Sequence, residues 1–303
     1  MPRFVWNGVG LTAPDNWEPA AIERDGLFLE SDGVPVCELK WNSVQGSFSF
    51  EKHLKRLTKS HKQADLRGVP ESETPEVWQA SLASLAESGI RHQSFIWQTE
   101  VHRGIGAALH NPATGLAALV QFFIHRKDDE AVAAEVLASF RDHSAGKTIP
   151  WAMFGLTGRI PTGFQLHTFT FQPGHYTIKY WLPKSVRQAK LPPGKGAGTT
   201  LIFERFAPAS VLLNGTDLEA WLRANLKDGP SEEMPFASSP GLVSWEGVSK
   251  GSLLRRALRR EVHSSGRAWV TDTGNSILSV RASGVIPVDE RQLIDICEAY
   301  ELV

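Results

Sequence analysis

Two short polar triplets in the sequence carry the residue types of acid–base chemistry. They are Glu100-Val101-His102 and Glu261-Val262-His263. In a β-strand, the Glu and the His of each triplet lie on the same face, near enough for general acid and base catalysis. The same alternation is typical of a half-exposed strand that buries its Val, and this interpretation is favoured. An enzyme that uses Glu100 with His102, or Glu261 with His263, on a sheet face is therefore the alternative function.

Other catalytic and ligand-binding motifs are absent from the sequence. Residues 144–148 end like a phosphate-binding loop, but Arg141 occupies the position of the first glycine, so the backbone cradle cannot form. No metalloprotease, hydrolase, dinucleotide-binding or calcium-loop spacing is present. The two cysteines, Cys37 and Cys297, form no Cys-x-x-Cys pair and have no His at ligand spacing. We therefore expect a non-catalytic protein without a metal or a cofactor.

A basic loop and two tryptophans are the candidate binding residues. Residues 183–199 combine prolines and glycines with four cations and no acidic residue, which predicts a mobile insertion. Trp181 precedes this loop and Trp245 follows a Pro- and Ser-rich stretch, so both are candidates for a binding rim. The candidate cations are Lys184, Arg187, Lys190 and Lys195 in the loop, and Arg255, Arg256, Arg259 and Arg260 in a second cluster. Such cations suit an acidic protein surface or phosphates, although a solvated face is the favoured interpretation.

The elements that would position these residues occur twice along the chain. A Trp-x-x-x-Gly-Leu-Thr strand pattern, a capped helix, the polar triplet and an acidic start to the last helix follow each other in the same order in both halves. The matched starting residues are Trp6 and Trp151, Ser49 and Asp217, Glu100 and Glu261, and Asp129 and Asp289. The sequence therefore predicts two tandem domains, 1–147 and 148–303, with the basic loop 183–199 inserted in the second.

Each copy predicts an α+β fold in which helices pack against an antiparallel sheet of about six strands. In the first copy, the predicted strands span 5–12, 26–30, 36–41, 90–100, 104–110 and 116–125, and the predicted helices span 50–63 and 129–142, with a linker between 63 and 90. In the second copy, residues 253–260 fit either a helix or a strand. The repeat favours a strand, because the matched segment 94–97 is rich in β-formers.

The ends of the repeat unit resemble a known family. The segment Gly10-Leu11-Thr12-x-Pro14-x-x-Trp17-Glu18, with residues 134–141 closing the unit, resembles the Mog1/PsbP-like family, once in each half. The second copy departs from the pattern, because Pro161 and Phe164 stand for Pro14 and Trp17 and Ala299-Tyr300 stands for Ser139-Phe140. The resemblance implies an α/β/α sandwich and roles in binding, as in nuclear-transport and photosystem accessory proteins and in bacterial chaperones that cradle apolar helices. It implies no shared catalytic residue.

Composition and charge fit this expectation. The 303 residues are 42% hydrophobic and 21% charged, with a formal net charge of -1, which is typical of a soluble globular chain. No signal peptide or membrane span is present, so we expect a cytoplasmic protein. Neither domain is strongly basic and no reader module occurs, so nucleic-acid binding is not expected. The expected function is that of a binding, adaptor or chaperone-like protein whose partner is another protein with an acidic or apolar-helix surface; its oligomeric state is left open.

Overall fold

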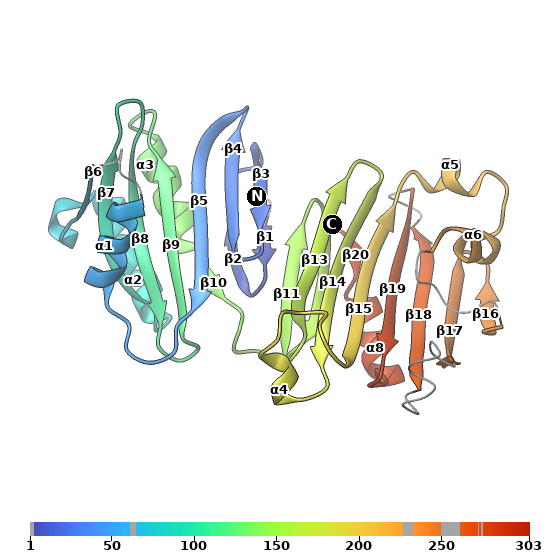
Figure 1. The fold of residues 1–303 in the computed structure, drawn as a ribbon. Helices are drawn as coiled ribbons and strands as arrows, with labels where there is room; N and C mark the ends of the chain where they lie inside the picture. Colours follow the sequence, from blue (N-terminus) through green and yellow to red (C-terminus); the bar gives the residue numbers. More distant parts are fainter. Residues whose placement is uncertain (1–2, 61–64, 227–232, 250–260, 272, 274) are drawn as a thin grey trace. The chain divides into compact units, whose positions relative to one another are not determined.

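The computed structural model of the chain describes residues 3–60, 65–226, 233–249, 261–271, 273 and 275–303 (Figure 1). The chain divides into two compact units, Met1–Met153 and Phe154–Val303, called unit 1 and unit 2 below. Antiparallel sheets make up most of the described elements in both units. The predicted α+β class with antiparallel sheets is confirmed at this level.

Unit 1 is built on a seven-stranded antiparallel sheet with the order β3-β4-β5-β9-β8-β7-β6. The strands are β3 (Trp17–Glu23), β4 (Gly26–Ser31), β5 (Val34–Ser43), β6 (Asp65–Gly68), β7 (Arg91–Gln98), β8 (Arg103–Asn111) and β9 (Leu116–Phe123). The central strands β8 and β9 bury most of their residues, as strands do when both faces of a sheet are covered. The sequence misses β3 and β6, because these edge strands are mostly exposed and show little apolar alternation.

Four further strands of unit 1 pair in the order β10-β2-β1-β11. They are β1 (Arg3–Trp6), β2 (Val9–Thr12), β10 (Arg141–Asp142) and β11 (Thr148–Met153). The sequence predicts one strand over 5–12, but the chain reverses at Asn7 and Gly8, whose φ angles are 44° and 89°. Asn and Gly adopt these positive φ angles more easily than other residues. The predicted strand is therefore a hairpin.

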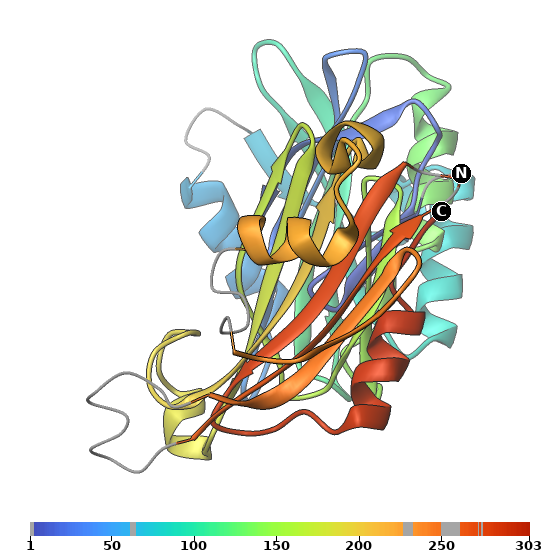
Figure 2. The same cartoon turned by 90° about the vertical axis from the view of Figure 1, so that its right-hand side faces the viewer.

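Helices cover both faces of the unit 1 sheet (Figure 2). They are α1 (Phe50–Ser60), α2 (Glu76–Glu87) and α3 (Asp129–Ala138), and a short 3-10 turn, η1 (Glu71–Glu73), precedes α2. Helix α1 packs Leu54 into a cluster with Trp97 on one face. On the opposite face, α2 lies against α3, and the Trp78 ring of α2 meets Phe122 edge to face at 5.8 Å. The sequence misses α2, which lies in the predicted linker.

Unit 2 is built on a seven-stranded antiparallel sheet with the order β13-β14-β15-β19-β18-β17-β16, which is the same succession of strands as in unit 1. The strands are β13 (Gln165–Gln172), β14 (His175–Pro183), β15 (Gly198–Phe206), β16 (Phe236–Ser239), β17 (Leu242–Ser249), β18 (Val262–Thr271) and β19 (Ser276–Gly284). Helices α5 (Ala209–Leu213) and α6 (Leu218–Asn225) cover one face and α8 (Glu290–Glu298) the other (Figure 2). Two further strands, β12 (Leu156–Pro161) and β20 (Glu301–Leu302), pair with each other.

Several connections differ between the otherwise parallel layouts of the units. Strands β4 and β5 join through Asp32 and Gly33, whereas β14 and β15 join through residues 184–197, which contain the short helix α4 (Val186–Ala189). Strands β6 and β7 are connected by the segment that holds α2, whereas β16 and β17 join through Pro240 and Gly241. Unit 2 therefore has a long loop between β14 and β15 and has no helix between β16 and β17.

The sheet order also corrects the matching of strands between the two halves. Strand β17 occupies the place in unit 2 that β7 occupies in unit 1, so residues 242–249, and not 253–260, correspond to the segment that contains 94–97. The predicted strand at 253–260 lies outside the described residues. The mismatch has a simple cause: only residues 99–102 separate β7 from β8, whereas residues 250–261 separate β17 from β18, so the second triplet lies farther from the strand that precedes it.

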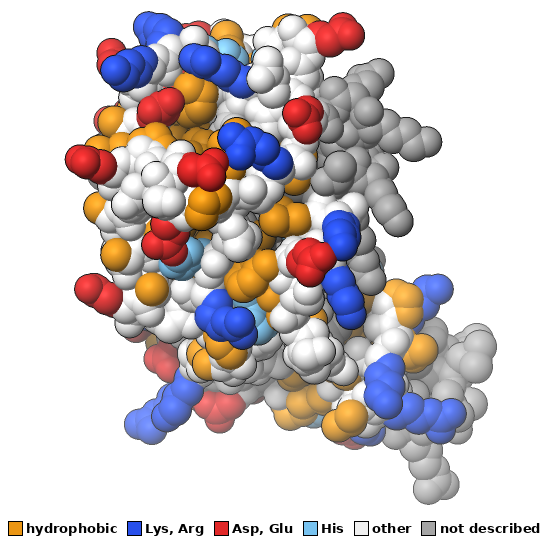
Figure 3. All heavy atoms as spheres, turned by 90° about the vertical axis from the view of Figure 1, so that its left-hand side faces the viewer, with side chains coloured by type: hydrophobic (Ala, Val, Ile, Leu, Met, Phe, Trp, Pro, Cys, Tyr) orange, Lys and Arg blue, Asp and Glu red, His pale blue; other side chains and the backbone are white. Residues whose placement is uncertain are grey.

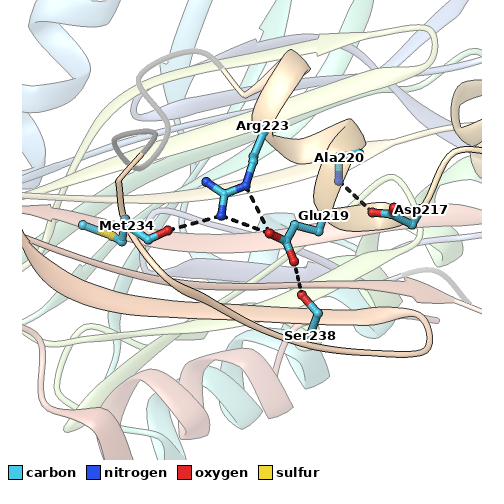
Figure 4. A network of polar contacts seen from close by, with 6 residues as sticks. All are labelled: Asp217, Glu219, Ala220, Arg223, Met234 and Ser238. Carbon is cyan, nitrogen blue, oxygen red and sulfur yellow. Dashed lines mark hydrogen bonds and ion pairs between the residues drawn. The ribbon is translucent and has the colours of Figure 1, made fainter.

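Helix α6 begins at a capped turn that a substitution can test. The Asp217 carboxylate accepts a hydrogen bond from the backbone N–H of Ala220 at 2.8 Å, and an ion pair of 3.0 Å between Arg223 and Glu219 follows within the helix (Figure 4). Glu219 accepts from Ser238, which ties the helix to β16. We expect Asp217→Ala to lower the free energy of unfolding by about 1 kcal/mol, because one helix N–H loses its acceptor. Urea denaturation measures this, and Asp217→Asn, which keeps an acceptor, is the control; equal losses in both variants would contradict the capping role.

Candidate functional site

The first polar triplet does not lie in a strand. Residues 99–102 form the turn between β7 and β8, in which the Thr99 hydroxyl accepts hydrogen bonds from the N–H groups of Val101 and His102 at 3.3 and 2.9 Å. Val101 is 80% exposed rather than buried. The expectation that Glu100 and His102 share a strand face is therefore wrong, because turn geometry replaces the two-residue alternation.

The second triplet is not equivalent to the first. Glu261 is exposed and precedes β18, whereas His263 lies within it. The register pairs Phe95 with Gly106 in unit 1 and Trp245 with Gly266 in unit 2. His263 lies three residues before Gly266, and Arg103 lies three residues before Gly106. His263 therefore corresponds to Arg103 and not to His102. A shift of one residue moves a side chain to the other face of a sheet, so the two triplets do not form one repeated site.

Unit 2 contains a cavity of about 400 Å³ on the sheet face that α6 shares. Two adjacent cross-strand rows form its floor. One row runs through Trp245, Gly266, Arg281, Ile202 and Lys179, and the next through Gly247, Ser264, Ser283, Thr200 and Trp181. Trp181 and Trp245, the two tryptophans selected from the sequence, thus line one cavity although they lie on different strands.

The charges around the cavity are unevenly matched. Arg281 donates to the Glu204 carboxylate at 3.1 Å, and His175 lies 3.5 Å from the same carboxylate. Burial alone would raise the pKa of Glu204, but the hydrogen bond from His175 and the charge and hydrogen bond of Arg281 lower it below its usual value. Lys179 has no ion pair within the described residues, and none of the described lining residues is Asp or Glu. The lining therefore carries an excess of positive charge.

Both indoles that line the cavity hold an unused hydrogen-bond donor. Trp181 is 7% and Trp245 is 4% exposed, and the Nε1 atom of neither has a partner among the described residues. A buried N–H group without an acceptor is costly, and such groups are rare in folded proteins. Glycines hold the two rings against the sheet: a Cβ atom at Gly198 would come within 2.4 Å of the Trp181 ring, and one at Gly266 within 2.2 Å of the Trp245 ring.

The basic loop, residues 184–197, closes one side of the cavity. Gly196 and Ala197 belong to the lining, and the backbone N–H of Lys184 donates to Ala197 at 3.0 Å. At Gly194 the loop packs against the His167 ring, which also lines the cavity. The four candidate cations of the loop are exposed, and no ion pair forms at any of them within the described residues: Lys184, Arg187, Lys190 and Lys195. The second basic cluster, Arg255, Arg256, Arg259 and Arg260, lies outside the described residues.

No family model and no curated protein matches the sequence. Among solved structures, the chain is similar to the Ran-binding protein Mog1p of Saccharomyces cerevisiae. The two chains are 9% identical, the similarity covers 49% of this chain and 90% of that chain, and the TM-score is 0.33.

The remaining candidates for chemistry are structural. Cys37 and Cys297 are buried free thiols, and burial raises the pKa of Cys297 to about 12 and that of Cys37 further. Within the described ranges, no group of three His, Cys, Asp or Glu side chains is arranged to hold a metal ion. None of the helices in the described part of the chain is long and apolar enough to cross a membrane.

Lys, Arg, Asp and Glu side chains are intermixed on the molecular face drawn in Figure 3.

Sequence reasoning missed Lys179, Glu204 and Arg281. A signal for the last two was present, because each interrupts an apolar strand: Glu204 follows Leu201-Ile202-Phe203, and Arg281 follows Val280. Charged residues are almost never fully buried unless they are paired, so two such interruptions predict an ion pair between two neighbouring strands. Lys179 carries no comparable signal, since a Lys on a half-exposed strand is common.

Proposed function

We propose that the protein is a non-catalytic, cytoplasmic binding protein, an adaptor or chaperone-like accessory protein, that captures a partner protein through unit 2. The observation that carries this proposal is the unit 2 cavity, which is lined by Trp181, Trp245 and the unpaired cation Lys179 and has no carboxylate among its described lining residues. Donors and cations without a matching acceptor suit recognition of an anionic group on a partner.

We further propose that the two units are copies of one Mog1/PsbP-like domain that arose by duplication. The shared order of their seven-stranded sheets supports this, as does the pairing of Gly106 under Phe95 and of Gly266 under Trp245. Duplication leaves one copy free to change. The features that distinguish unit 2, its loop 184–197 and its cavity, therefore belong to the copy in which a more specific interaction would have developed.

The basic loop would act on the rate of capture. Its four cations are exposed, and such charges steer an acidic partner while salt screens them beyond about 8 Å at physiological ionic strength. Because exposed charges contribute little to the lifetime of a complex, we assign the lifetime to the cavity and the approach to the loop.

The partner can be identified by site-specific cross-linking. A photoreactive amino acid at position 190, in the loop, is expected to capture a defined protein in cells of the source organism. The same label at Val77, which is exposed in unit 1, is the control. Capture of the same proteins at both positions would contradict a binding role for unit 2.

Replacing Lys184, Arg187, Lys190 and Lys195 together by Ser is expected to slow association with that partner about tenfold at low salt and to flatten the salt dependence of the rate. The fold is expected to remain intact, because the four side chains are exposed. Stopped-flow fluorescence measures the association rate over a salt series.

A matched control removes four exposed cations from unit 1, at Lys52, Arg126, Lys127 and Lys147. This variant loses the same net charge and is expected to keep most of the wild-type rate. If both variants slow association equally, net charge and not the loop steers the partner, and the role of the loop is refuted.

A further inference from the structure

The cavity in unit 2 lies where unit 1 places aromatic rings. In unit 1, one cross-strand row runs through Trp97, Gly104 and Phe123. The Trp97 and Phe123 rings meet edge to face with centroids 4.9 Å apart and pack with α1. At the same places in unit 2 the row runs through Gly247, Ser264 and Ser283. Ser283 therefore takes the place of the Phe123 ring, whereas the buried Met234 side chain fills the space beside Gly247, with its Cε atom 3.2 Å from where a Cβ would stand.

The neighbouring cross-strand row has an aromatic ring over a glycine in both units. Phe95 packs over Gly106 in unit 1, and Trp245 packs over Gly266 in unit 2. The unit 2 cavity gains a second indole from Trp181. Aromatic rings prefer edge-to-face or offset contact with other rings. The space between Trp181 and Trp245 is thus suited to an aromatic ring supplied from outside the chain.

The charged side chains of the cavity indicate which charge an aromatic ligand should carry. Lys179 has no ion pair within the described residues, while the charge of Arg281 is already balanced by Glu204. A carboxylate has the opposite charge to Lys179 and accepts several hydrogen bonds at once. A neutral or cationic ligand would leave the charge of Lys179 unmatched.

We propose that the unit 2 cavity binds an aromatic carboxylate, presented as the C-terminal aromatic residue of the partner protein. The ring lies in the space that Phe123 fills in unit 1, between Trp181 and Trp245, and the carboxylate accepts from Lys179. This inference rests on the proposed binding function, because it names the chemical group by which a partner is held.

The first test uses N-acetylphenylalanine and its neutral amide, N-acetylphenylalaninamide, with the full-length protein. Neither compound absorbs where tryptophan is excited, so the fluorescence of the protein reports binding. We expect the acid to bind with a dissociation constant of about 1 mM, typical of a ligand of this size, and the amide to bind about tenfold more weakly. Equal binding of acid and amide, or no saturable binding of the acid, would overturn the proposal.

Substitutions locate the binding site. We expect Lys179→Met to lose about tenfold in affinity for the acid and little for the amide, and Lys179→Arg to restore most of the loss. Ser283→Phe returns a ring to the position that Phe123 has in unit 1, and we expect it to abolish binding of both compounds. Ser283 is exposed, so the fold is expected to persist, and circular dichroism checks this. Lys127→Met, at an exposed position of unit 1, is the control; unchanged binding in Ser283→Phe would refute the location.

A peptide separates this proposal from the proposed function. An acetylated Asp-Asp-Gly-Phe peptide with a free carboxyl terminus carries the same terminal group together with acidic residues that can reach the loop. Tighter binding of the peptide than of N-acetylphenylalanine, lost when the four loop cations are replaced by Ser, supports a protein terminus as the ligand. Equal binding of the two supports the aromatic carboxylate but places its source in a small molecule, which would overturn the protein-terminus part of the proposal and the protein-partner function while leaving the site itself in place.

Discussion

Replacing Arg281 by Met is expected to lower the free energy of unfolding by about 3–5 kcal/mol, as breaking a buried ion pair does. The Arg281 and Glu204 side chains are only 6% and 7% exposed and lie 3.1 Å apart. Removing the guanidinium leaves the Glu204 carboxylate buried with His175 as its remaining described partner, at 3.5 Å. Urea denaturation at neutral pH measures the loss.

Acidity tests the electrostatic origin of this loss. In the wild-type protein the pKa of Glu204 is lowered, so the ionised carboxylate stabilises the folded state above its ordinary pKa of about 4.5, and this contribution is lost as the pH falls through the lower folded value. In Arg281→Met, burial still raises that pKa while the charge and hydrogen bond of Arg281 no longer lower it, so the folded pKa of Glu204 is higher than in the wild-type protein. The difference in stability between the two proteins is therefore expected to shrink as the pH falls below about 4.5. A double variant, Glu204→Leu with Arg281→Met, controls for packing and is expected to recover most of the stability at neutral pH. A loss that stays constant with pH would show that packing, and not charge, is responsible.

Replacing Trp78 by Ala is expected to lower the free energy of unfolding by about 3–5 kcal/mol, the usual cost of deleting a large buried aromatic side chain. Trp78 is 1% exposed, its ring contacts Phe122, and its Nε1 donates to the Ser94 hydroxyl at 3.0 Å. It is the residue that fixes α2 to the sheet. Thermal or urea unfolding measures the effect on the transition of unit 1.

Trp78→Phe separates the ring from its hydrogen bond. This variant keeps an aromatic ring in the site but loses the bond to Ser94, so we expect a loss of about 1–2 kcal/mol. Val77→Ala, at an exposed position of the same helix, is the control and is expected to change stability by less than about 0.5 kcal/mol. A loss below about 1 kcal/mol in Trp78→Ala would mean that α2 is held by other contacts.

An element of the fold can be predicted from the sequence when its signals lie in neighbouring residues. Helix α3 begins at Asp129, as predicted, because an acidic start and an apolar face are local signals. The hairpin at Asn7 and Gly8 was predicted as one strand, since a two-residue turn hardly disturbs the alternation around it. Helix α2 had a signal that was not used: Trp78, Leu82 and Leu85 recur at helical spacing.

The candidate site was less predictable than the elements that hold it. Trp181 and Trp245 were chosen by their position beside unusual segments, and their common cavity depends on the order of strands that are distant in the sequence. The missing ring at Ser283 has meaning only when the register of unit 2 is compared with that of unit 1. A glycine or serine on a strand carries no such information in one sequence.

The central pairing of each sheet has a consequence for synthesis of the protein. Strand β5 pairs with β9 and β15 with β19, and both pairings join residues 81 positions apart, Leu39 with Val120 and Leu201 with Ala282. During translation, the edge of β5 that pairs with β9 stays unpaired until most of unit 1 has been synthesised. The edge of β15 that pairs with β19 stays unpaired in the same way. Pairings between distant residues form slowly, and an unpaired strand edge is a template for pairing with another chain. Each unit therefore passes through a period in which its nascent half has an open strand edge, and the rate of translation sets how long that period lasts.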